Sequence, residues 1–235
     1  HAAALSQSMR DLGYSLETAI ADLIDNSITA VASSIHIYLS LGEAADPYLV
    51  ILDDGRGMTE DALLEAMRPG SRNPRETRAA NDLGRFGLGL KTASFSQCKS
   101  LTVMSCTDGK RVAAQWDLDV IGARNEWIVK LLSGAEMEQL PYADDLGEHG
   151  TYVLWRKLDR LLEGDEKARK EQAYEKLSIV ERHLSLVFHR YLSGEYNRRQ
   201  KLSIWINGHP VTAFDPFCTS NKATQLLQEE IVRIA

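Results

Sequence analysis

The first sixty residues carry apolar side chains at two different periods. In residues 15–31 they recur every three to four positions, which predicts an amphipathic helix with Ser15 as its N-cap. Residues 34–41 instead alternate between apolar and polar, and residues 48–52 are apolar almost throughout, so two strands should follow. The helix positions predicted to face the core are Leu16, Ile20, Leu23, Ile24 and Val31.

The same patterns continue to the end of the chain. Thr59 precedes a helical run that contains Leu63, Leu64 and Met67. Asp108-Gly109 separates two alternating runs and predicts a β-hairpin, as does Asn207-Gly208 further on. The remaining predicted elements are a helix that begins near residue 90, strands at 100–106, 111–118, 127–132, 152–155 and 202–206, and a long helix at 167–192. In that long helix, Leu177, Val180, Leu184, Val187 and Tyr191 are predicted to share one face.

Two polar side chains interrupt the pattern of the first predicted helix. Asp22 and Asn26 are four residues apart and therefore lie on one face, about a turn from each other. Asp25 lies beside them. A solvated helix face explains these residues, and so does a face whose carboxylate and amide oxygens hold a water molecule and a metal ion.

A carboxylate ends the second predicted strand. Asp53 is followed by Asp54-Gly55-Arg56-Gly57-Met58 and then by a helical segment. An Asp-Gly turn accounts for this pattern within a hairpin. Because a helix follows instead of a strand, the sequence favours a carboxylate at the floor of a pocket.

A glycine-rich stretch runs directly into the helix predicted from residue 90. Glycines that precede a helix let several N–H groups converge on one point, where the helix dipole also favours an anion. A tight turn is the other interpretation. The stretch contains Gly84, Arg85, Phe86, Gly87, Leu88, Gly89, Leu90 and Lys91. Residues 68–83, before it, have few apolar side chains and predict a mobile surface loop that could act as a lid.

Composition narrows the class of protein. The chain has 235 residues, of which 44% are hydrophobic and 26% charged, as in a globular protein with a substantial core. The net charge of −6 gives no support for nucleic-acid binding. The three cysteines lack metal-site spacing, which favours free thiols in a reducing, cytoplasmic compartment. No apolar run is long enough to span a membrane.

Taken together and in this order, four motifs resemble the GHKL ATPase superfamily, named for gyrase, the ninety-kilodalton heat-shock chaperones, histidine kinases and MutL. They are the helix with Asp22 and Asn26, the Asp53–Met58 segment, the glycine-rich stretch, and Gly150-Thr151. Within the superfamily the chain looks most like MORC-type and related bacterial ATP-binding proteins. The resemblance implies the Bergerat fold, an α/β sandwich with a mixed, mainly antiparallel sheet beneath helices.

The resemblance also implies a role for each motif. Asn26 matches a ligand of Mg²⁺, which needs few protein ligands because the phosphates and water complete its shell. Asp53 matches the acceptor of the adenine amino group, Gly57 and Met58 match residues against the purine, and Thr151 matches a residue that supports Asp53. The main chain from Gly84 to Leu90 should bind the phosphates of ATP, with Lys91 as a charge partner.

One residue departs from the family pattern. Asp22 stands where relatives that hydrolyse ATP carry a glutamate, which activates the attacking water. Aspartate is shorter by one methylene, and a misplacement of about 1 Å costs roughly 100-fold in rate. The sequence therefore predicts a slow, Mg²⁺-dependent ATPase that acts as a conformational or dimerisation switch. The alternative is a regulatory module that binds ATP or ADP with negligible hydrolysis.

The resemblance divides the chain into an ATPase domain at residues 1–160 and a helical connector with the start of a transducer-like segment at residues 161–235. We expect a longer full-length protein, whose further domains would contact DNA or a client protein. Neither Lys201 nor Lys222 can be assigned as the lysine that senses the γ-phosphate. A histidine kinase is disfavoured, because some fifteen residues precede the first predicted helix and leave no room for a phospho-accepting helix.

Overall fold

The computed structural model describes residues 2–11, 13–41, 46–68, 89–162, 164–195, 201–225 and 227. The helices are α1 (Ala2–Arg10), α2 (Leu16–Thr29), α3 (Glu60–Met67), α4 (Gly89–Gln97), α5 (Leu118–Arg124), α6 (Gly134–Glu138), α7 (Glu166–Val187) and α8 (His189–Ser193), with a short 3-10 turn at Ala143–Asp145. The strands are β1 (Ser34–Ser40), β2 (Tyr48–Asp53), β3 (Ser100–Thr107), β4 (Lys110–Asp117), β5 (Lys130–Leu131), β6 (Gly150–Arg156), β7 (Ser203–Ile206) and β8 (His209–Pro210).

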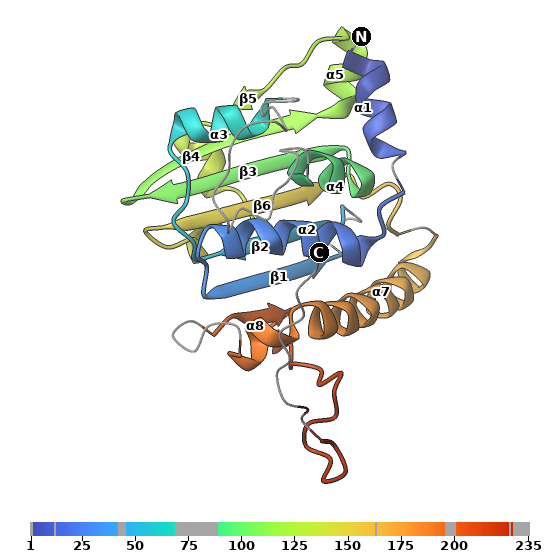
Figure 1. Cartoon of the computed structure of the whole chain (residues 1–235). Coiled ribbons are helices and arrows are strands. Elements are labelled where there is room, and N and C mark those ends of the chain that lie inside the picture. Colours follow the sequence, from blue (N-terminus) through green and yellow to red (C-terminus); the bar gives the residue numbers. More distant parts are fainter. Residues whose placement is uncertain are drawn as a thin grey trace, which may run out of the picture.

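The strands form one sheet in the order β5-β4-β3-β6-β2-β1-β7-β8. Its described pairs are antiparallel except for β1 and β7, which run parallel. Figure 1 shows α2 and α4 crossing the same face of this sheet, with α7 beyond β1. The mixed, mainly antiparallel sandwich predicted from the sequence is therefore confirmed.

The core lies between the helices and this face of the sheet. The apolar side of α2 packs there through Ile20, Leu23 and Ile24, because their spacing brings them onto one helix face. Alternate residues of the central strands point to the same side, and the intervening ones form a smaller cluster on the opposite face. Residues of a central strand that face α2 are thus both buried and close to the helix layer.

Several predicted elements differ in detail from the structure. Val31 is 59% exposed, not in the core, because α2 has ended and the residue adopts a left-handed backbone with φ of 64°. The predicted strand at 127–132 is confined to Lys130–Leu131. The predicted helix at 167–192 is divided at Phe188, and Val187 is 49% exposed, although it was placed on the apolar face.

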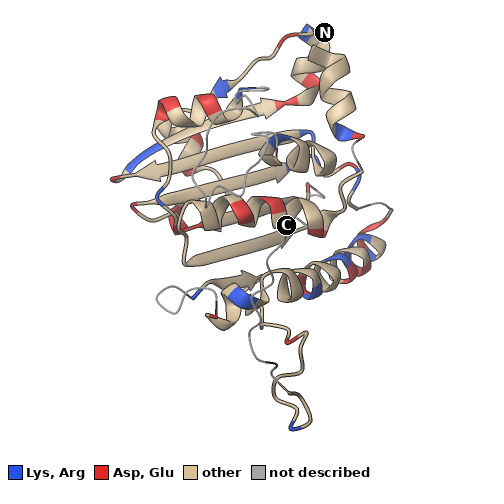
Figure 2. Cartoon of the chain, viewed as in Figure 1, with Lys and Arg blue, Asp and Glu red and all other residues tan. Residues whose placement is uncertain are grey.

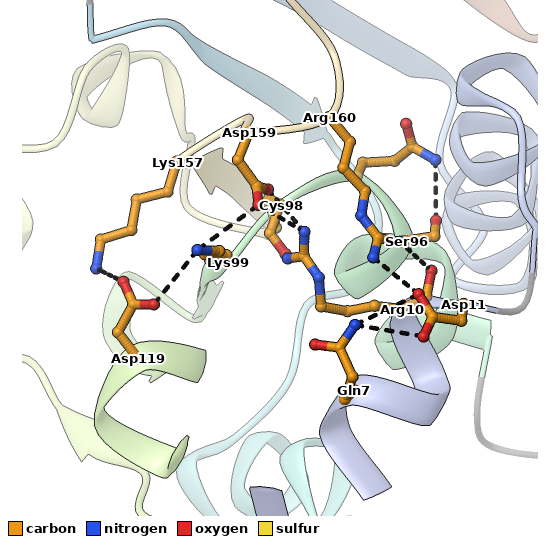
Figure 3. Close-up of polar contacts among 11 residues, drawn as sticks. Gln7, Arg10, Asp11, Ser96, Cys98, Lys99, Asp119, Lys157, Asp159 and Arg160 are labelled. Carbon is orange, nitrogen blue, oxygen red and sulfur yellow. Dashed lines mark hydrogen bonds and ion pairs between the residues drawn. The ribbon is translucent and has the colours of Figure 1, made fainter. Parts of the chain in front are cut away.

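Helix α1 was not predicted, and an ion-pair network holds it in place (Figure 3). Arg10 is 4% exposed, and its guanidinium donates to both carboxylate oxygens of Asp159 at 2.7 and 2.8 Å and to the Cys98 carbonyl at 3.0 Å. Arg160 in turn donates to the main-chain carbonyl of Arg10 at 2.7 Å and to Asp11 at 2.8 Å. These charges keep α1 against α4 and the segment that follows β6.

The C-terminal hairpin belongs to the same sheet as the rest. β7 pairs with β1 from Ser34↔Ser203 to Ile37↔Ile206, which confirms the predicted Asn207-Gly208 hairpin and places it beside β1. The division of the chain at residue 160 stays a prediction. Among the described residues, none of the helices has the length and apolar composition needed to cross a bilayer.

Candidate nucleotide site

Three polar side chains form a row across the ends of three neighbouring strands. Asp53 of β2 is paired with Thr151 of β6, and Thr151 is paired with Ser105 of β3. Ile51, two residues before Asp53, belongs to the core beneath the helices, so Asp53 faces the helix layer as well. Register alone thus gathers a carboxylate and two hydroxyl groups at one end of the sheet.

The Asp53 carboxylate is held from three sides. Ser27 of α2 donates its hydroxyl to Oδ2 at 2.7 Å, and the main-chain N–H groups of Gly55 and Thr151 donate to Oδ1 at 2.9 and 3.1 Å. Only 7% of the residue is exposed. Burial raises the pKa of Asp53, and these three hydrogen bonds oppose that shift because they favour the charged form. Oδ2 accepts one bond and keeps a lone pair for a further donor.

Glycines let the main chain close tightly around this row. Gly57 has φ of 69°, and a Cβ built there would lie 1.9 Å from the Cys106 carbonyl oxygen. At Gly150, with φ of 141°, a Cβ would lie 2.1 Å from the Asp53 carbonyl oxygen. A side chain at either position would push apart the segments that carry Asp53, Met58 and Thr151.

The neighbouring acid, Asp54, has a different role. Its carboxylate accepts from the main-chain N–H groups of Ser33 and Ser34 at 2.7 and 2.8 Å, which fixes the turn before β1. The Asp-Gly pattern therefore combines a structural carboxylate with one that faces the helices. Ser27 and Ser105 were not identified from the sequence. The sequence signal for Ser105 was a hydroxyl residue in a buried strand, and Ser100 and Thr102 of the same strand share that signal.

Another side of α2 carries the two predicted site residues of this helix. Asp22 is half-buried and Asn26 is exposed. A Cβ built at Gly89, the first residue of α4, would lie 3.8 Å from the Asp22 carboxylate oxygen Oδ2. The structure thus brings Asp22 to the point where the glycine-rich stretch enters its helix. Gly84, Arg85, Phe86, Gly87 and Leu88 lie outside the described residues.

Helix α2 as a whole is acidic. Helix α2 contains Glu17, Asp22 and Asp25 and no basic residue, and Figure 2 shows its red positions toward the viewer. Burial raises the pKa of Asp25 to about 6, and the nearby Asp22 carboxylate adds to the shift. Burial and Asp22 also raise the pKa of Tyr14, whose hydroxyl lies beside the Asp22 carboxylate. An anionic ligand beside this helix would need a cation between them.

The oxygen groups on this side of α2 suit Mg²⁺ that is also bound by a nucleotide better than a metal ion bound by protein side chains alone. Within the described ranges, no three His, Cys, Asp or Glu side chains come together to hold a metal ion. Asn26 offers an amide oxygen at the surface of α2, one turn from Asp22. Mg²⁺ accepts one or two protein oxygens when phosphates and water supply the rest.

Lys91 and Leu90 complete the predicted site residues that the structure describes. Leu90 is half-buried beside the main core. Lys91 is fully buried within α4. Its predicted pairing with phosphate stays a prediction.

Helix α2 connects the two groups of residues. Ser27, on one face of the helix, contacts Asp53, whereas Asp22 and Asn26 occupy another face. A mainly antiparallel sheet beneath such a helix, with a buried carboxylate at the end of β2, defines the class of Bergerat-fold ATP-binding domains. The chain belongs to the family of histidine kinase-, DNA gyrase B-, and HSP90-like ATPases, whose sequence profile matches residues 14–151.

A curated relative is similar over part of this region. The protein named ATPase morc-1 from Caenorhabditis elegans is 32% identical over 93 residues, which make up 39% of this chain and 10% of the relative. The chain therefore spans a small part of that relative's length. This similarity supports the MORC-type resemblance seen in the sequence.

Proposed function

We propose that the chain binds ATP with its adenine against Asp53 and hydrolyses it slowly with the help of Mg²⁺. The observation that carries this proposal is the buried Asp53 carboxylate, held by Ser27, Gly55 and Thr151 and left with acceptor capacity on Oδ2. The family membership supplies the nucleotide class.

A carboxylate in this position selects between purines. The amino group of adenine donates a hydrogen bond to it, whereas guanine has a carbonyl at the same position and would face the carboxylate with a second acceptor. A hydrogen bond to a charged group contributes roughly 1.5–3 kcal/mol, and an unpaired buried acceptor costs a similar amount. In this proposal, Gly57 and Met58 lie against the purine and Thr151 supports Asp53.

Asn26 would hold Mg²⁺ on the outward face of α2. The ion neutralises phosphate charge and so allows a triphosphate to approach the acidic helix. The main chain from Gly84 to Leu90, with Lys91, is the proposed phosphate-binding segment. Gly89 is the described residue that brings this segment next to Asp22.

Asp22 is the proposed general base for hydrolysis. Its carboxylate would accept a proton from water as the water oxygen attacks the γ-phosphorus and the bond to ADP breaks, which yields ADP and phosphate. Because Asp22 replaces a longer glutamate of the resemblance, we expect slow turnover. The second candidate, an ATP- or ADP-binding regulatory module with negligible hydrolysis, is favoured by this same shorter side chain.

The wider role is proposed from the family and from the partial relative. ATP binding and hydrolysis would drive a conformational or pairing switch in a homodimer, with residues 161–235 as connector and transducer-like segment. DNA or a client protein would be contacted through further domains.

Calorimetric titration with Mg-ATP tests the pocket. Wild type and Asp54→Asn should bind Mg-ATP with similar affinity, while the affinity of Asp53→Asn should be at least tenfold lower. Thermal unfolding without nucleotide checks that each variant is folded. Phosphate release then tests Asp22. Asp22→Asn should bind ATP but lose turnover. Glu17→Gln, on the same helix, should keep both ATP binding and turnover. If folded wild type does not bind ATP, the pocket assignment is wrong; if it binds but releases no phosphate, the chain is a binding module.

A further inference from the structure

Ser105 lies at one end of the row of polar side chains in the candidate nucleotide site. It is fully buried on β3, in register with Thr151, and it completes the row that begins with Asp53. Its hydroxyl accepts a hydrogen bond from the main-chain N–H of Met58 at 2.8 Å and donates one to the Gly150 carbonyl at 2.9 Å. The Thr151 hydroxyl lies 3.4 Å away.

These bonds continue as far as the Asp53 carboxylate. The Gly150 carbonyl and the Thr151 N–H belong to one planar peptide unit, so orienting the carbonyl also orients the N–H. That N–H donates to Asp53 Oδ1 at 3.1 Å. A chain of hydrogen bonds therefore runs from the Met58 N–H through Ser105 and the Gly150–Thr151 peptide to Asp53, and successive bonds polarise one another.

The same strand also fixes the segment that precedes Met58. Gly57 packs so closely on the Cys106 carbonyl that a Cβ would lie 1.9 Å from the oxygen. Ser105 and Cys106 thus hold Gly57 and Met58 from neighbouring positions of β3. The separation between this segment and Asp53 depends on β3, although β3 was not assigned to the nucleotide site.

We propose that Ser105 is a positioning residue that sets the selectivity of the site for a purine with an amino group. It acts by holding the Met58 main chain and the Asp53 carboxylate at a fixed separation. Its donor is already used on Gly150, and its acceptor on Met58, so it works through these groups and not by contact with the base. This inference rests on the proposed ATP binding and adds a residue that determines its specificity.

The test compares two nucleotides on four proteins. Wild type, Ser105→Ala, Ser105→Thr and Ser100→Ala are titrated calorimetrically with the Mg²⁺ complexes of ATP and of purine riboside triphosphate, which lacks the amino group. Ser100→Ala is the matched control, because it removes a buried hydroxyl at the other end of β3. Ser100 accepts a bond from Gln115 at 3.4 Å, and Gln115 keeps a second bond to Thr102 at 3.1 Å.

We expect Ser105→Ala to lower the affinity for ATP about tenfold, which is the equivalent of one hydrogen bond to a charged group. The affinity for the nucleotide without the amino group should fall about threefold or less. The ratio of the ATP affinity to the affinity for that nucleotide therefore falls. Ser105→Thr keeps the hydroxyl and should restore the ratio, and Ser100→Ala should leave it unchanged.

Two results would overturn the inference. An unchanged ratio in folded Ser105→Ala, whether both affinities stay the same or fall equally, would show that Ser105 has no part in selectivity. Wild type that is folded and does not bind ATP would reject the proposed function, and the role of Ser105 with it. The Ser105→Ala ratio decides the matter even where Ser105→Thr does not fit its buried site.

Discussion

The hydroxyl of Ser27 donates a hydrogen bond to Oδ2 of Asp53 at 2.7 Å, and through this contact helix α2 meets the end of strand β2. Both residues are buried. The bond joins the helix that carries Asp22 and Asn26 to the carboxylate proposed to bind adenine. The position of α2 relative to the base site therefore depends on one side-chain contact in addition to apolar packing.

Ser27→Ala should lower the free energy of unfolding by about 1–3 kcal/mol, because a buried carboxylate loses a donor. The Ser27 bond lowers the pKa of Asp53, so its loss should raise that pKa further, and ATP binding should weaken as Asp53 protonates more readily. Denaturant unfolding and ATP titration measure both effects. Ser94→Ala is the control, since the buried Ser94 hydroxyl has no hydrogen-bond partner within the described structure. Equal losses in the two variants would contradict the role of Ser27.

Gly57→Ala should destabilise the fold far more than Gly109→Ala. The two glycines have nearly the same φ, 69° and 73°, but a Cβ at Gly109 meets nothing within 4 Å. Gly109→Ala should cost about 1–2 kcal/mol for its left-handed backbone. Gly57→Ala adds the overlap with Cys106 and should cost about 3 kcal/mol or more in total. Equilibrium unfolding of both variants checks this difference, and similar costs would show that the close approach at Gly57 relaxes easily.

The raised pKa of Asp25 should make the stability of the fold depend on pH. Its pKa is about 6 in the folded protein, against an ordinary value of 3.8, so the folded state binds this proton more tightly than the unfolded state does. The stability it contributes is therefore complete below about pH 4 and is lost as the pH rises through 6. Asp25→Asn should raise the melting temperature at pH 8 and leave it nearly unchanged at pH 4. A similar shift at both pH values would mean that the carboxylate charge is not the cause.

Asp22→Glu tests the departure from the family pattern. The additional methylene extends the carboxylate toward the position that the longer side chain occupies in the resemblance, and we expect phosphate release to rise by on the order of tenfold or more. The Km for ATP should change little, because the proposed adenine site lies around Asp53 at the end of β2 and does not include Asp22. A lower rate for Asp22→Glu with unchanged ATP binding would show that the protein is adapted to the shorter carboxylate.

The sequence predicted the elements whose patterns are local. β1 is set by alternation, β2 by a short apolar run, and the hairpin at Asp108-Gly109 by two residues that adopt left-handed backbones. Asp53 and Thr151 lie side by side, as the resemblance implied. Asp22 and Asn26 share the outward side of α2, because a four-residue spacing fixes their relation in any helix.

What the sequence did not show depends on contacts between distant segments. Helix α1 buries Arg10, and that burial is understandable only once Asp159 lies beside it. The partners of Ser105 come from two other segments, at Met58 and Gly150, which no local pattern connects. The break at Phe188 interrupts a sequence that remains helical in composition on both sides.

The parallel pairing of β1 with β7 has a consequence for the order in which the protein forms during its synthesis. Asp53, Ser105 and Thr151 all leave the ribosome before Ser203, the first residue of β7. Chains emerge at about 5–20 residues per second, and pairings between distant segments form late because they close long loops. We therefore expect the row of Asp53, Thr151 and Ser105 to assemble while the far side of β1 is still an open edge. β7 then pairs with that edge of β1 after the site has formed.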